Sequence, residues 1–86
     1  MKIQGAIIKE QNVKFAIVKV DRSILTSPKE QNKIKTEFAN LFGTIPVIFM
    51  ALDSKSVATY VGRQDIVNYL SYIKSSQIPW REFSST

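Results

Sequence analysis

The sequence contains no cysteine and no histidine. Without cysteine the chain cannot form disulfides or use a thiolate nucleophile, and without either residue it lacks the usual ligands of a zinc site. The absence of histidine also removes the side chain that most often acts as a general base near neutral pH. We therefore expect a fold held by core packing or by association with another chain, and no cofactor.

Long apolar runs are missing as well. No segment approaches the roughly 18 apolar residues that a membrane-spanning helix needs, and the first residues do not resemble a secretion signal. We therefore expect a cytoplasmic protein that does not enter the membrane. The 86 residues, of which 44% are hydrophobic and 22% charged, have the size and composition of one globular domain over residues 1–86.

The net charge of +5 is concentrated in the first part of the chain. Residues 1–36 contain eight basic and three acidic side chains, whereas residues 37–86 contain four of each. Such an asymmetry indicates either a solubilising surface or an anionic partner.

Two β-rich segments open the sequence, at residues 2–9 and 13–20. Glu10, Gln11 and Asn12 lie between them, and asparagine tolerates the left-handed backbone of a tight turn. The pattern predicts a β-hairpin.

The signals for a first helix begin at Ser27. Ser27, Pro28 and Glu30 provide an N-cap, a proline at the first helical position and an acidic third residue. Gly43 is placed to end the helix. One apolar stripe is predicted along it, formed by Ile34, Phe38, Leu41 and Phe42.

Residues 45–73 predict a strand–turn–strand–helix unit. Residues 46–52 have no polar side chain and favour a buried strand, residues 53–56 a turn, and residues 57–61 a second strand. A second helix is predicted from Gly62 and Arg63, with its apolar stripe at Ile66, Leu70 and Ile73 and its end near residues 75–77. This unit resembles the C-terminal ββα half of thioredoxin-like domains over about a third of the chain. Without a Cys-x-x-Cys motif, the resemblance implies no redox activity.

For residues 75–86 we expect an irregular tail that Ile78, Trp80 and Phe83 attach to the core. The predicted order is therefore ββαββα, an α+β fold with a four-stranded, mainly antiparallel sheet and two helices. Strand order 2-1-3-4 is favoured because it places the first and third strands centrally and makes all neighbours antiparallel. The alternative is order 1-2-3-4, with strands two and three parallel.

The strands are apolar on both sides, which is unusual for a sheet with one solvated face. Either the two helices cover opposite faces, or one face meets another molecule. The second possibility predicts a homodimer through an apolar sheet face.

Three groups of side chains are candidates for function. Arg63, near the start of the second helix, could bind an anion together with Tyr60 and Trp80, or could simply pair with Asp65. A basic set could bind nucleic acid with Phe15 or Tyr60 as stacking surfaces; it consists of Lys14, Lys29, Lys33 and Lys35.

The third group is acidic. Asp53, Ser54 and Lys55 follow the apolar strand, and Asp21 follows the second strand. This pattern resembles the (D/E)-x-K element of PD-(D/E)-x-K nucleases, which implies a metal held by Asp21 and Asp53. The same residues are also those expected in a turn.

The sequence therefore predicts a small non-catalytic binding or protein-interaction module that self-associates. A nucleic-acid-binding accessory protein is the alternative, and a metal-dependent nuclease is the third hypothesis.

Overall fold

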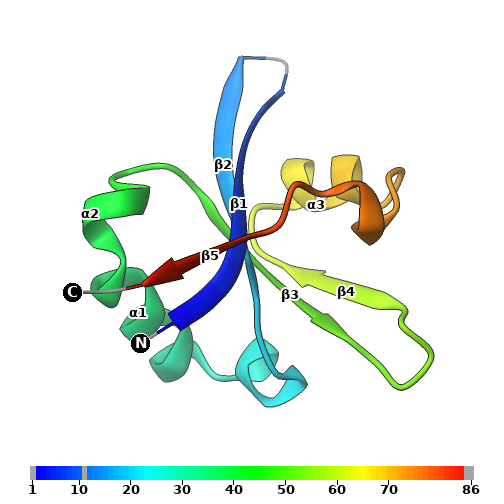
Figure 1. The fold of residues 1–86 in the computed structure, drawn as a ribbon, viewed down its shortest axis with the longest axis horizontal. Helices are drawn as coiled ribbons and strands as arrows, with labels where there is room; N and C mark the ends of the chain where they lie inside the picture. The colour runs from blue at the N-terminus through cyan, green and yellow to red at the C-terminus, as the bar shows by residue number, and fades with distance from the viewer. Residues whose placement is uncertain (1, 11, 85–86) are drawn as a thin grey trace.

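The computed structural model of the chain describes residues 2–10 and 12–84. Figure 1 shows a strongly twisted sheet with helical segments on both sides. In chain order the elements are β1 (Lys2–Glu10), β2 (Val13–Lys19), the 3-10 helix η1 (Arg22–Thr26), α1 (Pro28–Glu37), α2 (Ala39–Phe42), β3 (Val47–Leu52), β4 (Ala58–Val61), α3 (Gln64–Leu70), the 3-10 helix η2 (Ser75–Gln77) and β5 (Arg81–Ser84).

The sheet is mixed and five-stranded, in the order β4-β3-β2-β1-β5. β2 and β3 are parallel, and every other neighbouring pair is antiparallel. The α+β class is confirmed. The favoured order 2-1-3-4 was wrong: the first four strands follow the alternative order, 1-2-3-4, with strands two and three parallel.

Burial explains why β2, rather than β1, is central. Residues 15–18 of β2 and residues 48–51 of β3 are all buried. Adjacent parallel strands covered on both faces typically have such continuous apolar runs. Parallel neighbours also need a long crossover, and the chain between β2 and β3 provides it as η1, α1 and α2.

The C-terminal segment was predicted to be irregular, and this was wrong for residues 75–77 and 81–84. Residues 75–77 form η2, and β5 pairs antiparallel with β1, with Ile3 opposite Phe83. The ring of Phe83 lies over Gly5, where an added Cβ would be 3.6 Å from the ring and 2.7 Å from the Ile17 carbonyl oxygen. The contact with Phe83 would be an ordinary one, whereas the short distance to Ile17 means that a glycine is needed where β1 lies against the backbone of β2. The predicted attachment to the core is confirmed, because Ile78 is buried and Phe83 is half-buried.

Each face of the sheet has its own apolar core. On one face, α3 and the segment leading to β5 cover a cluster of Ala6, Phe15, Ile17, Ile48, Met50, Ile66, Leu70 and Ile78. On the other, η1, α1 and α2 cover a cluster of Ile3, Ala16, Val18, Ile34, Phe38, Phe42 and Phe49. The helices thus cover opposite faces, so the protein's own chain occupies the surface through which a dimer was expected. Self-association itself stays a prediction.

The caps of the first helix are as predicted, and three of the four predicted stripe residues, Ile34, Phe38 and Phe42, are buried in one cluster. Ser27 Oγ accepts a hydrogen bond from the Glu30 N–H at 3.3 Å, and Gly43 ends α2 with a φ of 56°. At Phe38 the backbone leaves helical geometry, with φ −110° and ψ 22°, and divides the predicted helix into α1 and α2. Because of this break, Leu41 is not on the buried side and is 44% exposed.

The outer half of the β1–β2 hairpin has no further strand beside it among residues 2–10 and 12–84. β5 pairs with β1 only at residues 2–5, and β3 pairs with β2 only from Ala16 onward. Asn12 turns the chain with a φ of 66°; Gln11 lies outside the described residues. The hairpin consequently projects at one end of the molecule (Figure 1). In the described part of the chain no helix is long and apolar enough to cross a membrane.

Candidate functional site

Arg63, predicted to bind an anion, faces a carboxylate of its own chain. Its guanidinium donates two hydrogen bonds to Asp65, Nε to Oδ1 and Nη2 to Oδ2, each at 2.8 Å. The hydrogen bond from Arg63 lowers the pKa of the Asp65 carboxyl. Since this fork geometry is the one Arg uses to bind carboxylates, the donors that would bind an external anion already have a partner.

Tyr60 and Trp80, predicted with Arg63, pack against the same apolar cluster on the α3 side of the sheet. The Trp80 indole Nε1 donates a hydrogen bond to the Ser75 carbonyl oxygen at 3.0 Å. The structure therefore brings two of the three predicted residues into one cluster, and Arg63 is not part of it.

Asp53, a predicted metal ligand, closes the turn between β3 and β4. Its Oδ1 accepts hydrogen bonds from the N–H groups of Lys55 at 2.8 Å and Val57 at 2.9 Å. These bonds, the one from Val57 first, lower the pKa of the carboxyl, and the nearby charge of Arg22 adds to the shift. No group of three or more potential metal ligands, with or without Asp21, occurs among the described residues.

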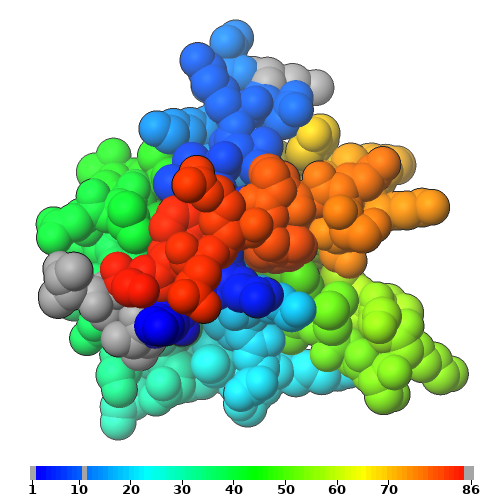
Figure 2. Space-filling model, in the orientation of Figure 1, coloured from blue at the N-terminus to red at the C-terminus, as the bar shows by residue number. Residues whose placement is uncertain are grey.

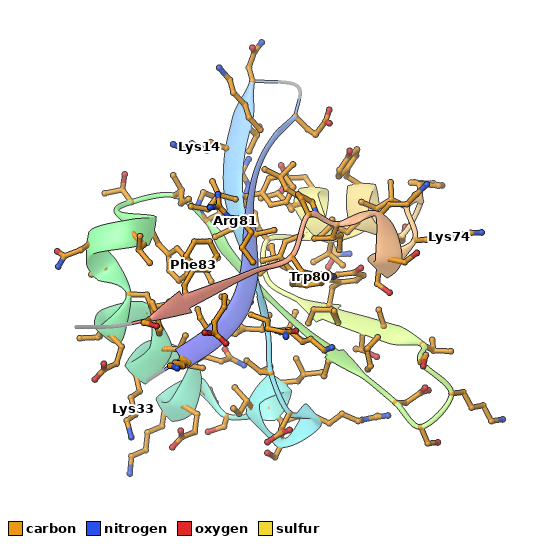
Figure 3. The ribbon with its side chains drawn as sticks, viewed as in Figure 1. Lys14, Lys33, Lys74, Trp80, Arg81 and Phe83 are labelled. Carbon is orange, nitrogen blue, oxygen red and sulfur yellow. The ribbon has the colours of Figure 1, made fainter. Side chains whose placement is uncertain are left out.

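The four predicted nucleic-acid-binding lysines lie in two places. Lys14 is on β2 in the projecting hairpin, whereas Lys29, Lys33 and Lys35 are on α1. Figure 3 shows Lys14 and Lys33 toward opposite ends of the molecule. The ammonium of Lys35 lies 5.9 Å from the centre of the Phe49 ring. The structure thus does not gather the four lysines into one surface.

The predicted stacking aromatics are not accessible for stacking. Phe15 is 2% exposed, and its ring packs edge-on against Tyr69 with centres 6.4 Å apart. Tyr60 is half-buried in the same cluster. Stacking requires an exposed ring face, so neither residue presents one to a base.

A different group of side chains, three of them cationic, lies on one side of β1, β2 and β5. Lys9 and Lys14 are directly opposite each other across β1 and β2, so they share one side of the sheet. Arg81 is opposite Gly5, on that same side, and Ile7 lies between the two positions along β1. We call this group, Ile7, Lys9, Lys14 and Arg81, the hairpin surface. This is the side of the sheet that carries α1 and α2, because Ile3 and Phe83, two residues along from Gly5 and Arg81, belong to the cluster under those helices.

The hairpin surface is exposed and has one sign of charge. All four side chains are exposed, and Ile7 is 36% exposed. No described strand residue on this side of the sheet is acidic. Glu10 is on the opposite side, beside Tyr69. The pKa of Tyr69 is raised by burial and, in addition, by the charge of Glu10. Glu82 is also on the opposite side, where its carboxylate is 3.9 Å from the Lys2 ammonium.

The Lys9–Lys14 pair is unfavourable for the hairpin itself, because like charges directly opposite each other destabilise a strand pair. Both lysines are exposed, and Figure 2 shows that the hairpin stands clear of the rest of the visible surface. The arrangement can hold an anionic group that bridges the two lysines, with Arg81 further along the strand.

Sequence reasoning found Lys14 but missed Lys9 and Arg81. The predicted hairpin carried the signal for Lys9, because a turn at residues 10–12 brings residues 9 and 14 opposite each other. No sequence pattern placed Arg81 beside these lysines, since residues 75–86 were not predicted to form a strand. Comparison of the chain with protein-family models, with curated proteins and with solved structures gives no match.

Proposed function

We propose that this chain is a small non-catalytic binding module whose hairpin surface docks on the sugar–phosphate backbone of a nucleic-acid duplex. The observation that supports it is the Lys9–Lys14 pair: the two lysines lie directly opposite each other on neighbouring strands, and no described strand residue on the same side is acidic. A phosphate group would neutralise this repulsion, and each neutralised phosphate also releases condensed counterions.

The dimensions of the surface suit a duplex. Arg81 is opposite Gly5, four residues along β1 from Lys9, which corresponds to about 14 Å of strand. The major groove of B-form DNA is about 12 Å wide. The lysine pair and Arg81 can therefore contact phosphates on the two sides of one groove.

A duplex is favoured over a single strand because the hairpin surface lacks an exposed aromatic ring. Binding of single strands depends on bases stacking on such rings. Tyr72 is the one aromatic residue among the large exposed hydrophobic side chains of the described residues, at 88% exposure. It follows α3, which covers the other face of the sheet.

The proposal is tested by adding the protein to a fluorescently labelled 20-base-pair DNA duplex and following the fluorescence anisotropy of the label. Three phosphate contacts predict a slope of log affinity against log salt of about −2.7, or roughly 40-fold weaker binding at 200 mM than at 50 mM salt. Replacing Lys9, Lys14 and Arg81 with glutamine should abolish this binding.

The matched control replaces three cations on α1, Lys29, Lys33 and Lys35, with glutamine, so that the net charge changes equally. This variant should show the same slope of log affinity against log salt concentration as the unchanged protein. Absence of binding at low salt, or equal loss of binding in the two triple variants, would show that the hairpin surface does not bind duplexes.

Self-association is the second candidate, and the observation in its favour is the free edge of β1. Residues 6–10 pair with β2 on one side and with no other described strand. Such an edge can accept a strand from a second copy. Sedimentation at tens of micromolar is the test: a dimer supports this function, and a monomer eliminates it.

A further inference from the structure

The outer edge of β4 has no neighbour in the described part of the chain. β4 pairs with β3 on one side and is the last strand of the sheet on the other (Figure 1). The Asp53 N–H donates a hydrogen bond to the Val57 carbonyl oxygen at 3.1 Å, so Val57 directs its backbone groups toward β3. Alternate residues of an antiparallel strand direct their N–H and C=O groups to opposite edges. Ala58 and Tyr60 therefore direct theirs outward, where an edge strand can accept a further strand.

A cavity of about 360 Å³ lies beside this edge, between β4, the end of α3 and η2. Its apolar lining comes from Ala58, Leu70 and Ile73. Two exposed hydrophobic side chains adjoin it: Val57, 57% exposed, precedes Ala58, and Tyr72, 88% exposed, precedes Ile73. Residues directly opposite each other on antiparallel strands have their side chains on the same side. A strand added antiparallel to β4 would therefore place every second side chain over this cavity.

The charges around β4 favour an acidic partner. Lys74 lines the cavity, and Lys55 precedes Ser56, which also lines it. The charge of Arg22 is near enough to help lower the pKa of the Asp53 carboxyl. Asp53 is the one acidic side chain of residues 53–62, and it already accepts hydrogen bonds from two backbone N–H groups. Cations thus outnumber acids around this edge.

We propose that the edge of β4 binds an extended segment of another protein in which apolar and acidic residues alternate. The segment adds as an antiparallel strand and exchanges backbone hydrogen bonds with Ala58 and Tyr60. Its apolar side chains pack in the cavity on Leu70 and Ile73, and its acidic side chains lie in the field of the surrounding cations. Strand addition to a sheet edge is a recurring mode of peptide recognition. The site is separate from the hairpin surface and does not depend on the proposed binding of nucleic acid.

A designed peptide provides the test. The full-length chain is added to a fluorescein-labelled eight-residue peptide of alternating valine and glutamate, and the fluorescence anisotropy of the label is followed. We expect saturable binding. A control peptide with four valines followed by four glutamates has the same composition and charge but does not place its apolar side chains on one side of a strand. It should bind about tenfold more weakly or worse.

N-methylation of the peptide tests the backbone hydrogen bonds. In the proposed pairing the valines are opposite Ala58 and Tyr60, so their N–H groups donate to β4. N-methylation of the valines should weaken binding about tenfold or more, because these hydrogen bonds are lost. N-methylation of the glutamates, whose N–H groups face away from β4, should change the affinity by less than about twofold.

Variants of the protein locate the site. Ser71 lines the cavity and is exposed, so Ser71→Trp should obstruct the cavity and weaken binding about tenfold. Asn68→Trp is the matched control, because Asn68 is an exposed residue of α3 that does not line the cavity. The variant with Lys9, Lys14 and Arg81 replaced by glutamine should bind the peptide as the unchanged protein does.

Three results would overturn the proposal. The first is the absence of saturable binding at about 1 mM protein. The second is equal affinity for the unmethylated peptide and the peptide methylated at its valines, which requires no variant of the protein. The third is loss of binding in the hairpin variant but not in Ser71→Trp, with circular dichroism confirming that both variants are folded, because this would place the peptide on the hairpin instead of β4.

Discussion

Reversing the charge of Lys9 should make the protein more stable while it weakens binding of a nucleic-acid duplex. Lys9 is directly opposite Lys14, so Lys9→Glu converts a repulsive cross-strand pair into an attractive one. Opposite-charge cross-strand pairs contribute about 0.2–1 kcal/mol, and like charges destabilise. Because Lys9→Glu both removes a repulsion and adds an attraction between two exposed side chains, we expect a total gain of about 0.5–1 kcal/mol.

For a domain of this size such a gain corresponds to a rise of about 2–8 °C in Tm. Thermal unfolding followed by circular dichroism measures it. The gain should shrink in 1 M salt, where the screening length falls to about 3 Å.

Lys14→Glu is the reciprocal variant and should give a similar gain. The double variant Lys9→Glu/Lys14→Glu restores a like-charged pair, so its stability should return close to that of the unchanged protein. Additive gains in the double variant, or no gain in either single variant, would refute the reasoning that the two ammonium groups repel each other across the hairpin.

Three further predictions concern other parts of the fold. Tyr60→Phe should raise the free energy of unfolding in urea by about 1 kcal/mol, because it removes a buried hydroxyl that has no partner in the described residues; a loss of stability would mean that the hydroxyl is hydrogen-bonded. Gly62→Ala should destabilise by about 1–3 kcal/mol, since its Cβ would lie 2.4 Å from Ile48 Cδ1 at a φ of +155°; unchanged denaturation would contradict this close approach. The pKa of Asp53 is lowered from 3.8, so its charge stabilises the fold above about pH 4 and this contribution is lost as the pH falls through the lowered value. Asp53→Asn should therefore lose less stability between pH 7 and pH 2.5 than the unchanged protein, and equal losses would contradict the assignment.

The parts of the fold that sequence patterns predicted are those with strong local signals. The capping serine, Ser27, and the helix-ending glycine, Gly43, act through hydrogen bonds and backbone geometry within a few residues. The turn at Asp53 is similarly local. The strand order required a comparison between distant segments. Burial of β2 on both faces, indicated by the continuous run from Phe15 to Val18, was the signal for a central strand beside β3.

The fifth strand could not be predicted from its own residues. Three of the four residues 81–84 are polar, and none of them is fully buried. They form a strand because β1 offers a free edge and because Phe83 packs against the apolar cluster on the α1 side of the sheet. For the same reason the position of Arg81 in the hairpin surface was not foreseen, whereas Lys9 followed from the predicted turn.

The most direct test of duplex binding by the hairpin surface is to locate the surface of the protein that contacts a DNA duplex. The ¹⁵N-labelled chain is titrated with an unlabelled 20-base-pair duplex at 50 mM salt, and amide shifts are mapped onto the structure. If the hairpin surface binds the duplex, the largest shifts should occur around Ile7, Lys9, Lys14 and Arg81 and should disappear at 500 mM salt. Shifts centred on α1, at Lys29 and Lys33, or no shifts at low salt, would contradict it.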